Sequence, residues 1–259
     1  MSDLVTRLRQ AGCVFAEEEA AILYSAAADT ADLERLVARR VSGEPLEHVV
    51  GWAEFAGLRI PVAPGVFVPR RRTELVARVA ARLAPASGTV VDLCCGAGAI
   101  GVAIATWRED LTVIAADIDP VAVELARRTL EPLGGTALVS DMDASLPPAL
   151  AGRAHVVASC PPYVPTRQIA LMPPEARHYE PRVALDGGKD GARMQARVFK
   201  AAARLLAPGG ACVVETSEHL VGTTLAAASE AGFTAWIEKD EDRGATAVFA
   251  RLRSTHSNA

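Results

Sequence analysis

The sequence predicts an α/β protein, in which a small N-terminal helical domain precedes a doubly wound, mostly parallel sheet. From Thr73 onward, short apolar runs typical of buried strands alternate with segments of helical periodicity. This alternation indicates a parallel sheet with crossover helices. Residues 3–42 instead hold no proline and place Ala, Leu and Glu at helical spacing. A chain of 259 residues, half of them apolar, is long enough to bury a core of this kind.

The N-terminal part divides into two predicted segments. Helix starts are expected near Ala16 and at Thr30, with Thr30 as the N-cap of its helix, so residues 1–47 form the helical domain. The run from Val49 to Ile60 has period-two apolar spacing and glycine punctuation. It predicts a β-hairpin linker over residues 48–72.

The rest of the chain is expected to form the α/β domain, residues 73–253, followed by a disordered tail, residues 254–259. Its last two strands are expected to pair antiparallel. The predicted strands lie near residues 89–93, 112–117, 136–140, 154–159, 211–216, 233–238 and 246–252, and the predicted helices near 98–107, 120–131 and 191–206.

Composition and charge exclude several classes of protein. The net charge of −4 gives no global attraction to nucleic acid or to an anionic membrane, and Arg70 to Arg72 is a local cluster best explained as a solvated face. Five scattered cysteines without a C-x-x-C pair indicate neither a disulfide framework nor a metal site. The start of the chain lacks a signal peptide, and no apolar run approaches the ~20 residues of a membrane span. We therefore expect a soluble, cytoplasmic protein.

A glycine-rich turn follows the first strand of the α/β domain. Small residues there let a ligand approach the backbone, next to the N-terminus of the following helix. Dinucleotide enzymes use similar turns, so the turn alone does not identify the ligand. The candidate cofactor residues of this turn are Cys94, Cys95, Gly96, Ala97 and Gly98.

Three acids at successive strand ends narrow the choice of ligand. Asp92 precedes the glycines, where a cationic amino group would need a counter-charge, and Asp117, followed by Ile118, ends the next strand, where a carboxylate can take both ribose hydroxyls. Asp141 follows the third strand, and Met142 could cover an adenine face. Each acid alone could be a helix N-cap. Together they favour S-adenosylmethionine as the cofactor.

An acceptor slot is predicted at Cys160, Pro161, Pro162 and Tyr163. The two prolines form a cis-prone, rigid turn that withholds two N–H donors, so nearby carbonyls can accept from a ligand. With an aromatic ring next to it, the turn suits a planar amino group; the alternative is a rigid loop on a sheet edge. Cys160 is a candidate for both the acceptor site and the cofactor site.

These motifs together resemble the protein-(glutamine-N5) methyltransferases, which include the release factor glutamine methyltransferases. The resemblance covers about residues 40–252. It implies a class I, Rossmann-like methyltransferase fold, and a glutamine side-chain amide in a release factor or ribosomal protein as the acceptor. The matching segments are Gly43 to Leu46, Glu54-Phe55, Val68 to Arg70, Thr73-Glu74, Asp92 to Gly98, Asp117 to Asp119, Pro161 to Tyr163, Glu180 to Gly191, Pro208 to Gly210, and Glu215.

The chain departs from the family pattern at several positions. Cys160 stands where the family has the Asn of Asn-Pro-Pro-Tyr, and a thiol cannot reproduce a bidentate amide contact. Cys94 replaces the first glycine of the cofactor turn, and the pattern Pro-Arg-Pro-x-Thr-Glu becomes Pro69 to Glu74 with Arg71 in place of the second proline. The cofactor site is therefore expected to be intact and the substrate site altered. Two alternatives stay open: transfer to a nucleobase amino group, and a cofactor-binding protein that has lost its acceptor site.

Overall fold

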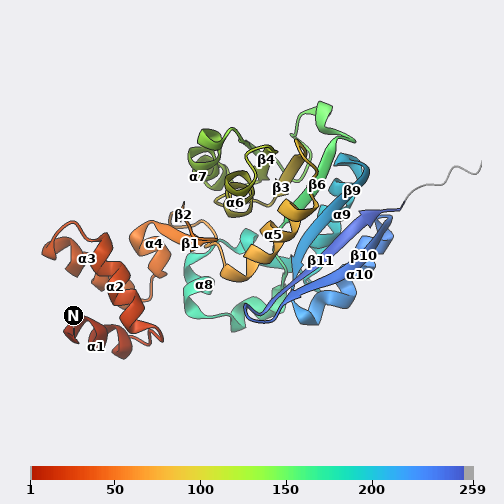
Figure 1. Ribbon diagram of the computed structural model, residues 1–259. Helices are drawn as coiled ribbons and strands as arrows, with labels where there is room; N and C mark the ends of the chain where they lie inside the picture. The colour runs from red at the N-terminus through yellow and green to blue at the C-terminus, as the bar shows by residue number, and fades with distance from the viewer. Residues whose placement is uncertain (1, 254–259) are drawn as a thin grey trace, which may run out of the picture.

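The computed structural model describes residues 2–253, and a seven-stranded sheet forms its centre (Figure 1). The strand order is β10-β11-β9-β6-β3-β4-β5. Only β11 runs against the others, since it pairs antiparallel with both β9 and β10. The predicted mixed sheet is thus confirmed. Its strands are β3 (Thr89–Leu93), β4 (Thr112–Asp117), β5 (Thr136–Val139), β6 (Ala154–Ser159), β9 (Leu206–Thr216), β10 (Phe233–Asp240) and β11 (Ala245–Leu252).

Helices cover both faces of the sheet because its central strands are apolar on both sides. Val90 packs into the core under α5 to α7, whereas Val91, the next residue, packs under α9 and α10. Successive side chains of a strand point to opposite faces, so one apolar run supplies both cores. The helices are α5 (Glu74–Leu83), α6 (Ala99–Trp107), α7 (Pro120–Leu130), α9 (Arg193–Leu205) and α10 (Val221–Glu230).

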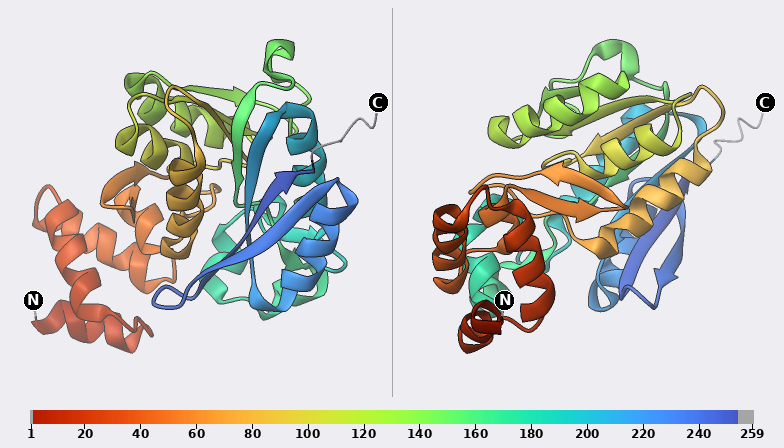
Figure 2. Two further views of the ribbon diagram at one scale, coloured as in Figure 1. Left: turned by 45° about the vertical axis from the view of Figure 1, so that its right-hand side comes forward. Right: turned by 60° about the vertical axis from the view of Figure 1, so that its left-hand side comes forward.

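The N-terminal helices form a separate small core at one end of the molecule (Figure 2). Leu8, Leu23 and Val37 are fully buried there. The N-cap of α3 is Asp29 rather than Thr30, because the Asp29 carboxylate accepts from the backbone N–H of Asp32. These helices are α1 (Ser2–Gln10), α2 (Ala16–Ala26), α3 (Thr30–Val41) and α4 (Leu46–Val50).

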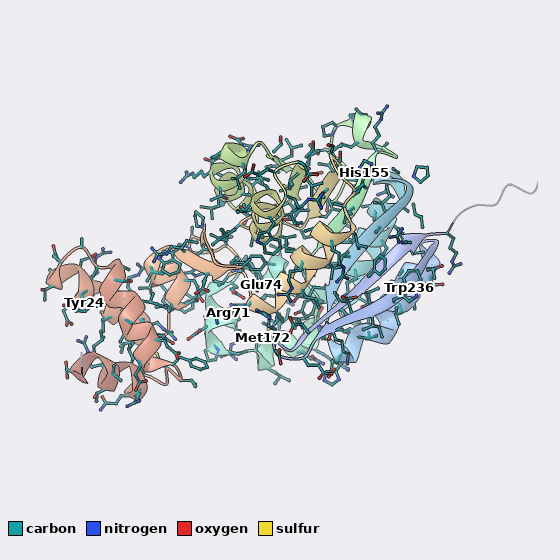
Figure 3. All side chains as sticks on the ribbon, viewed as in Figure 1. Tyr24, Arg71, Glu74, His155, Met172 and Trp236 are labelled. Carbon is teal, nitrogen blue, oxygen red and sulfur yellow. The ribbon has the colours of Figure 1, made fainter. Side chains whose placement is uncertain are left out.

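The hairpin is shorter than the sequence indicated. Its strands are β1 (Trp52–Phe55) and β2 (Leu58–Pro61), whereas residues 49–50 belong to α4. The left-handed Gly51 ends α4, so the chain turns into β1 there. Glu74, at the start of α5, accepts from the backbone N–H of Ala56 and fastens the hairpin to the sheet domain; Figure 3 shows Arg71 and Glu74 in this region.

A segment between β6 and α9 was not predicted as regular structure. Two short strands, β7 (Val164–Pro165) and β8 (Asp186–Gly188), pair in parallel and enclose α8 (Pro174–Tyr179). Arg40 of α3 is buried and pairs with Glu19 of α2 and, at 2.7 Å, with Glu175 of α8. This ion cluster joins the N-terminal helices to the segment. The tail predicted over residues 254–259 lies outside the described residues.

Candidate functional site

A cavity of 450 Å³ opens at the carboxyl ends of the parallel strands. The strand order reverses beside β3, since β4 and β5 lie on one side of it and β6 on the other. Parallel sheets bind ligands at such a switch point. The cavity residues that follow these strands are Cys94 to Ala97 after β3, Asp117 to Asp119 after β4, Ser140 to Met142 after β5, and Cys160 and Pro162 after β6.

Most of the predicted site residues line this cavity. Four do not: Asp92, Gly98, Pro161 and Tyr163. Pro161 and Tyr163 belong to the acceptor turn, while Asp92 and Gly98 support the cofactor turn from behind. The predicted residues that line the cavity are Cys94, Cys95, Gly96, Ala97, Asp117, Ile118, Asp141, Met142, Cys160 and Pro162.

The cofactor turn contains three residues with positive φ angles. Gly96 and Gly98 have φ of 54° and 83°, and Cys94 has φ of 56°, a conformation that costs a non-glycine residue free energy. A Cβ at Gly98 would meet the Ala126 Cβ at 2.9 Å, so glycine is required there by packing against α7. Burial raises the pKa of the Cys94 thiol to about 12. The thiol therefore keeps its proton and forms an uncharged part of the cavity lining.

Asp117 is placed to hold a diol. Its Oδ2 accepts from the Gly96 N–H at 2.8 Å and its Oδ1 from the Asp119 N–H at 2.9 Å, which fixes the carboxylate at the floor of the cavity. Each oxygen keeps a second lone pair for a hydroxyl donor. Burial raises the pKa of Asp117, and the two N–H donors oppose this. The geometry fits the ribose of the predicted cofactor.

Asp92, which the sequence predicts as a counter-charge for a cationic amino group, lies behind the cofactor turn. It is fully buried, does not line the cavity, and its Oδ2 accepts from the Gly101 N–H at 2.9 Å. Its Oδ1 has no hydrogen-bond partner among the described residues. Burial raises the pKa of Asp92 to about 8, so the carboxyl is mainly neutral at pH 7. The role of Asp92 as a counter-charge therefore stays a prediction, because the carboxyl would have to lose its proton to provide that charge.

Asp92 should make the free energy of unfolding decrease as the pH rises. An acid whose pKa is higher in the folded than in the unfolded state binds an extra proton when folded, so folding weakens as pH rises through that window. Between pH 4 and about 8 the expected loss is about 1.4 kcal/mol per pH unit. Urea unfolding of wild type and Asp92→Asn at pH 5, 6, 7 and 8 measures the slope. The variant should show a shallower dependence of unfolding free energy on pH. Equal slopes would contradict the raised pKa of Asp92 in the folded protein.

Asp141 and Met142 line the cavity after β5. The Asp141 carboxylate accepts from Arg197 of α9 at 2.7 Å. Met142 is buried and has a φ of 56°. A thioether and a carboxylate on one wall suit the flat face and the amino edge of an adenine.

The predicted acceptor turn contains Cys160, which lines the cavity, and lies beside Glu215, which does not line it. Thr73 Oγ1 donates to Cys160 Sγ at 3.8 Å. Tyr163 OH donates to Glu215 Oε1 at 3.0 Å, and Arg72 Nε donates to the same oxygen at 3.1 Å. Burial raises the pKa of Tyr163, so its hydroxyl keeps the proton that it donates. Sequence reasoning missed Arg72 and Glu215 as members of this site.

The two prolines of the acceptor turn have trans peptide bonds, since no peptide bond in residues 2–253 is cis. The cis-prone turn expected from the sequence is therefore wrong in that respect. Ala158 and Ser159 belong to β6 and pair with β3 and β9 on either side. The Pro161 carbonyl, which follows the sheet, is thus the better candidate to accept from a ligand amino group.

The arginine cluster is not a free basic patch. Arg70 pairs with Glu180, Arg71 with Glu54 and Arg72 with Glu215. Electrostatic attraction to phosphates needs cations that are not already neutralised. His155, at the start of β6, accepts from the Thr89 N–H at 2.9 Å, so one of its ring nitrogens is used in a structural contact (Figure 3).

Several cavity residues lie outside the predicted site. Phe67, Pro69 and Arg70 line the cavity from the linker, and Thr73 lines it from the turn before α5. Composition gives no local signal for these four residues, and the segments that resemble the family include Pro69, Arg70 and Thr73 but not Phe67. The other such residues are Pro181 to Ala184 and Asp186, which lie in a family segment, and Arg193, Met194 and Arg197, which do not.

Within residues 2–253 no group of three or more His, Cys, Asp or Glu side chains could hold a metal ion. No helix in that range is long and apolar enough to cross a membrane.

The fold and the site define a class I, S-adenosylmethionine-dependent methyltransferase. The methyltransferase small domain model matches residues 58–172. A methyltransferase of Pyrococcus furiosus superposes with a TM-score of 0.53 at 18% identity, over 76% of this chain and 89% of that one. The release factor glutamine methyltransferase of Geobacter sulfurreducens is 40% identical over 199 residues, which are 76% of this chain and 69% of that protein. The chain belongs to the release factor glutamine methyltransferase family.

Another relative has a different acceptor. The 4-amino-L-phenylalanine/4-methylamino-L-phenylalanine methyltransferase of Streptomyces pristinaespiralis is 35% identical over 190 residues, which are 71% of this chain and 64% of that protein.

Proposed function

We propose that this protein transfers a methyl group from S-adenosylmethionine to the side-chain amide nitrogen of a glutamine in a peptide-chain release factor. The observation that supports it is the juxtaposition, in one cavity, of the Asp117 carboxylate at the cofactor end and the Cys160 turn at the acceptor end. The 40% identity to a release factor enzyme supports the choice of substrate.

The cofactor supplies an electrophilic methyl group on a sulfonium, so the transfer needs no metal. Asp117 would hold the ribose, and Asp141 and Met142 would bound the adenine. The Pro161 carbonyl would accept an N–H of the acceptor amide and place the nitrogen in line with the methyl. Holding two reactants in line can contribute ~7–11 kcal/mol to lowering the barrier.

The N-terminal helices are proposed to dock the release factor. They lie outside the sheet domain and reach α8 through the Arg40–Glu175 ion pair. Exposed apolar side chains gather near the turn between α1 and α2, where Val14 and Phe15 are 83% and 64% exposed. Such residues fit a protein partner better than solvent.

The direct test is incubation of the purified protein with radiolabelled S-adenosylmethionine and a purified release factor. A lysate from a strain that lacks the gene serves as an unbiased source of acceptors. We expect the label on a glutamine of the release factor after digestion and mass spectrometry. Asp117→Ala, which damages the cofactor end, controls for non-enzymatic labelling. Label confined to nucleic acid, or to another protein, would contradict the proposed acceptor.

A further inference from the structure

Glu215 is a buried carboxylate that the proposed transfer does not use directly. It lies near the carboxyl end of β9, between β6 and β11 in the sheet, and its side chain is 2% exposed. The fully buried Gln195 of α9 donates its side-chain N–H to the Glu215 carbonyl at 3.0 Å. The sheet and α9 therefore fix the backbone from which this carboxylate projects. Burial of a carboxylate costs free energy unless hydrogen bonds and charges compensate it.

Two donors from distant parts of the chain meet at Glu215 Oε1. Tyr163 of the acceptor turn donates its hydroxyl hydrogen at 3.0 Å, and Arg72, in the turn before α5, donates from Nε at 3.1 Å. Thr73, the residue after Arg72, makes a second link, since its hydroxyl donates to the Cys160 sulfur at 3.8 Å. The turn before α5 and the acceptor turn are thus joined at two points, and the stronger donors share the Glu215 carboxylate.

Tyr163 is held at its backbone as well as at its hydroxyl. A Cβ at Gly187 of β8 would lie 2.7 Å from the Tyr163 Cα, so β8 packs directly against the Tyr163 backbone. With its hydroxyl bonded to Glu215, Tyr163 is fixed at both ends. Cys160 and Pro162 precede it in the same turn and line the cavity. The position of Tyr163 therefore determines where this part of the cavity wall lies.

We propose that Glu215 is a positioning residue for methyl transfer: with Arg72 as its cationic partner, it holds Tyr163 and thereby keeps the acceptor turn in line with the methyl group. The inference rests on the proposed methyl transfer and assigns a part in it to two further residues. Neither Glu215 nor Arg72 is among the described residues that line the cavity, so both act through Tyr163 and the turn. Misplacement of a reacting group by about an ångström can cost roughly a hundredfold in rate.

The first test separates the hydrogen bond from the volume of the side chain. Glu215→Gln keeps an oxygen that accepts from Tyr163 and Arg72, whereas Glu215→Leu accepts nothing. At saturating acceptor, the kcat of Glu215→Leu should fall by at least about tenfold, as for the loss of a hydrogen bond to a charged group. The kcat of Glu215→Gln should stay within about threefold of wild type. The Kd of S-adenosylmethionine, measured by calorimetry, should change by less than about twofold in both variants.

The second test asks whether Glu215 acts through Tyr163. Tyr163→Phe removes only the hydroxyl and should lower the kcat of the wild type by about tenfold. In the Glu215→Leu background the same change should lower kcat by less than about twofold, because the bond is already lost. Independent structural roles of the two residues would instead give losses that multiply.

Arg72→Met tests the cationic partner. The carboxylate keeps its bond to Tyr163 but loses the cation that compensates its burial, so kcat should fall by about three- to tenfold. Arg82→Met is the matched control, because Arg82 of α5 pairs with Glu238 at 3.0 Å and neither residue is among the described cavity residues. The control should keep the wild-type kcat. Equal kcat values for Arg72→Met and Arg82→Met would overturn the part assigned to Arg72.

The outcomes separate this inference from the proposed acceptor. A wild-type kcat in Glu215→Leu, or losses that multiply in the double variant, would overturn the inference and leave glutamine methylation standing. If Glu215→Leu does not fold, Tyr163→Phe decides, since a kcat within about twofold of wild type would overturn it. If the wild type labels only another acceptor from the lysate, the glutamine function is overturned, and the same variants are compared on that acceptor. Labelling of no acceptor would overturn both.

Discussion

Asp117→Ala should weaken the binding of S-adenosylmethionine by about tenfold or more. Asp117 lines the cavity with a carboxylate already fixed by the Gly96 and Asp119 N–H groups. Two hydroxyl hydrogen bonds to a charged acceptor contribute about 3 kcal/mol together. The variant also loses the bond that shapes the turn at Gly96. Isothermal titration calorimetry with the cofactor measures the change.

Asp143→Ala is the matched control for this experiment. Asp143 follows β5, pairs with Arg204 at 2.6 Å and does not line the cavity. Its removal should leave cofactor affinity unchanged, although an ion pair is lost. Equal affinity of Asp117→Ala and wild type would show that the ribose is held elsewhere.

Arg40→Met should destabilise the N-terminal helices and lower the methylation of a release factor. Arg40 is 6% exposed and bonds Glu19, Glu175 and the Glu44 carbonyl. Removal of one member of a buried ion cluster leaves the other charges unpaired, which costs about 3–5 kcal/mol. We expect faster limited proteolysis between α3 and α4 and at least about a tenfold drop in kcat/KM for the protein acceptor, which corresponds to about 1.4 kcal/mol. Cofactor affinity should stay at the wild-type value.

Arg71→Met controls for the loss of an arginine. Arg71 pairs with Glu54 at the surface, where the two side chains are 72% and 56% exposed. Such pairs contribute about 0–1 kcal/mol, so this variant should unfold close to wild type. If Arg40→Met behaves like Arg71→Met in proteolysis and in methylation, the cluster does not couple the helices to the rest of the molecule.

The sheet could be predicted from local sequence because each strand is an apolar run between turn residues. Strands β3, β4 and β6 begin and end where the runs at 89–93, 112–117 and 154–159 indicated. Asp117 and Cys160 could be assigned to one site for the same reason, since the carboxyl ends of parallel strands meet at one edge.

The segment between β6 and α9 could not be predicted in this way. Its strands, β7 and β8, have two and three residues, too short for any periodicity. They form because they pair with each other across α8, a contact between positions about twenty residues apart: Val164 lies opposite Asp186.

The sequence by itself determined the fold class, the family and the place of the cofactor turn, since these depend on periodicity and on motifs within a few residues of one another. Only the tertiary structure decided the charge state around the acceptor. Arg70 and Arg72 find Glu180 and Glu215, which lie 110 and 143 residues further along the chain. Asp92 is neutralised by burial under α6. Burial and charge neutralisation depend on which distant groups the fold brings within a few ångströms, and no local pattern encodes that.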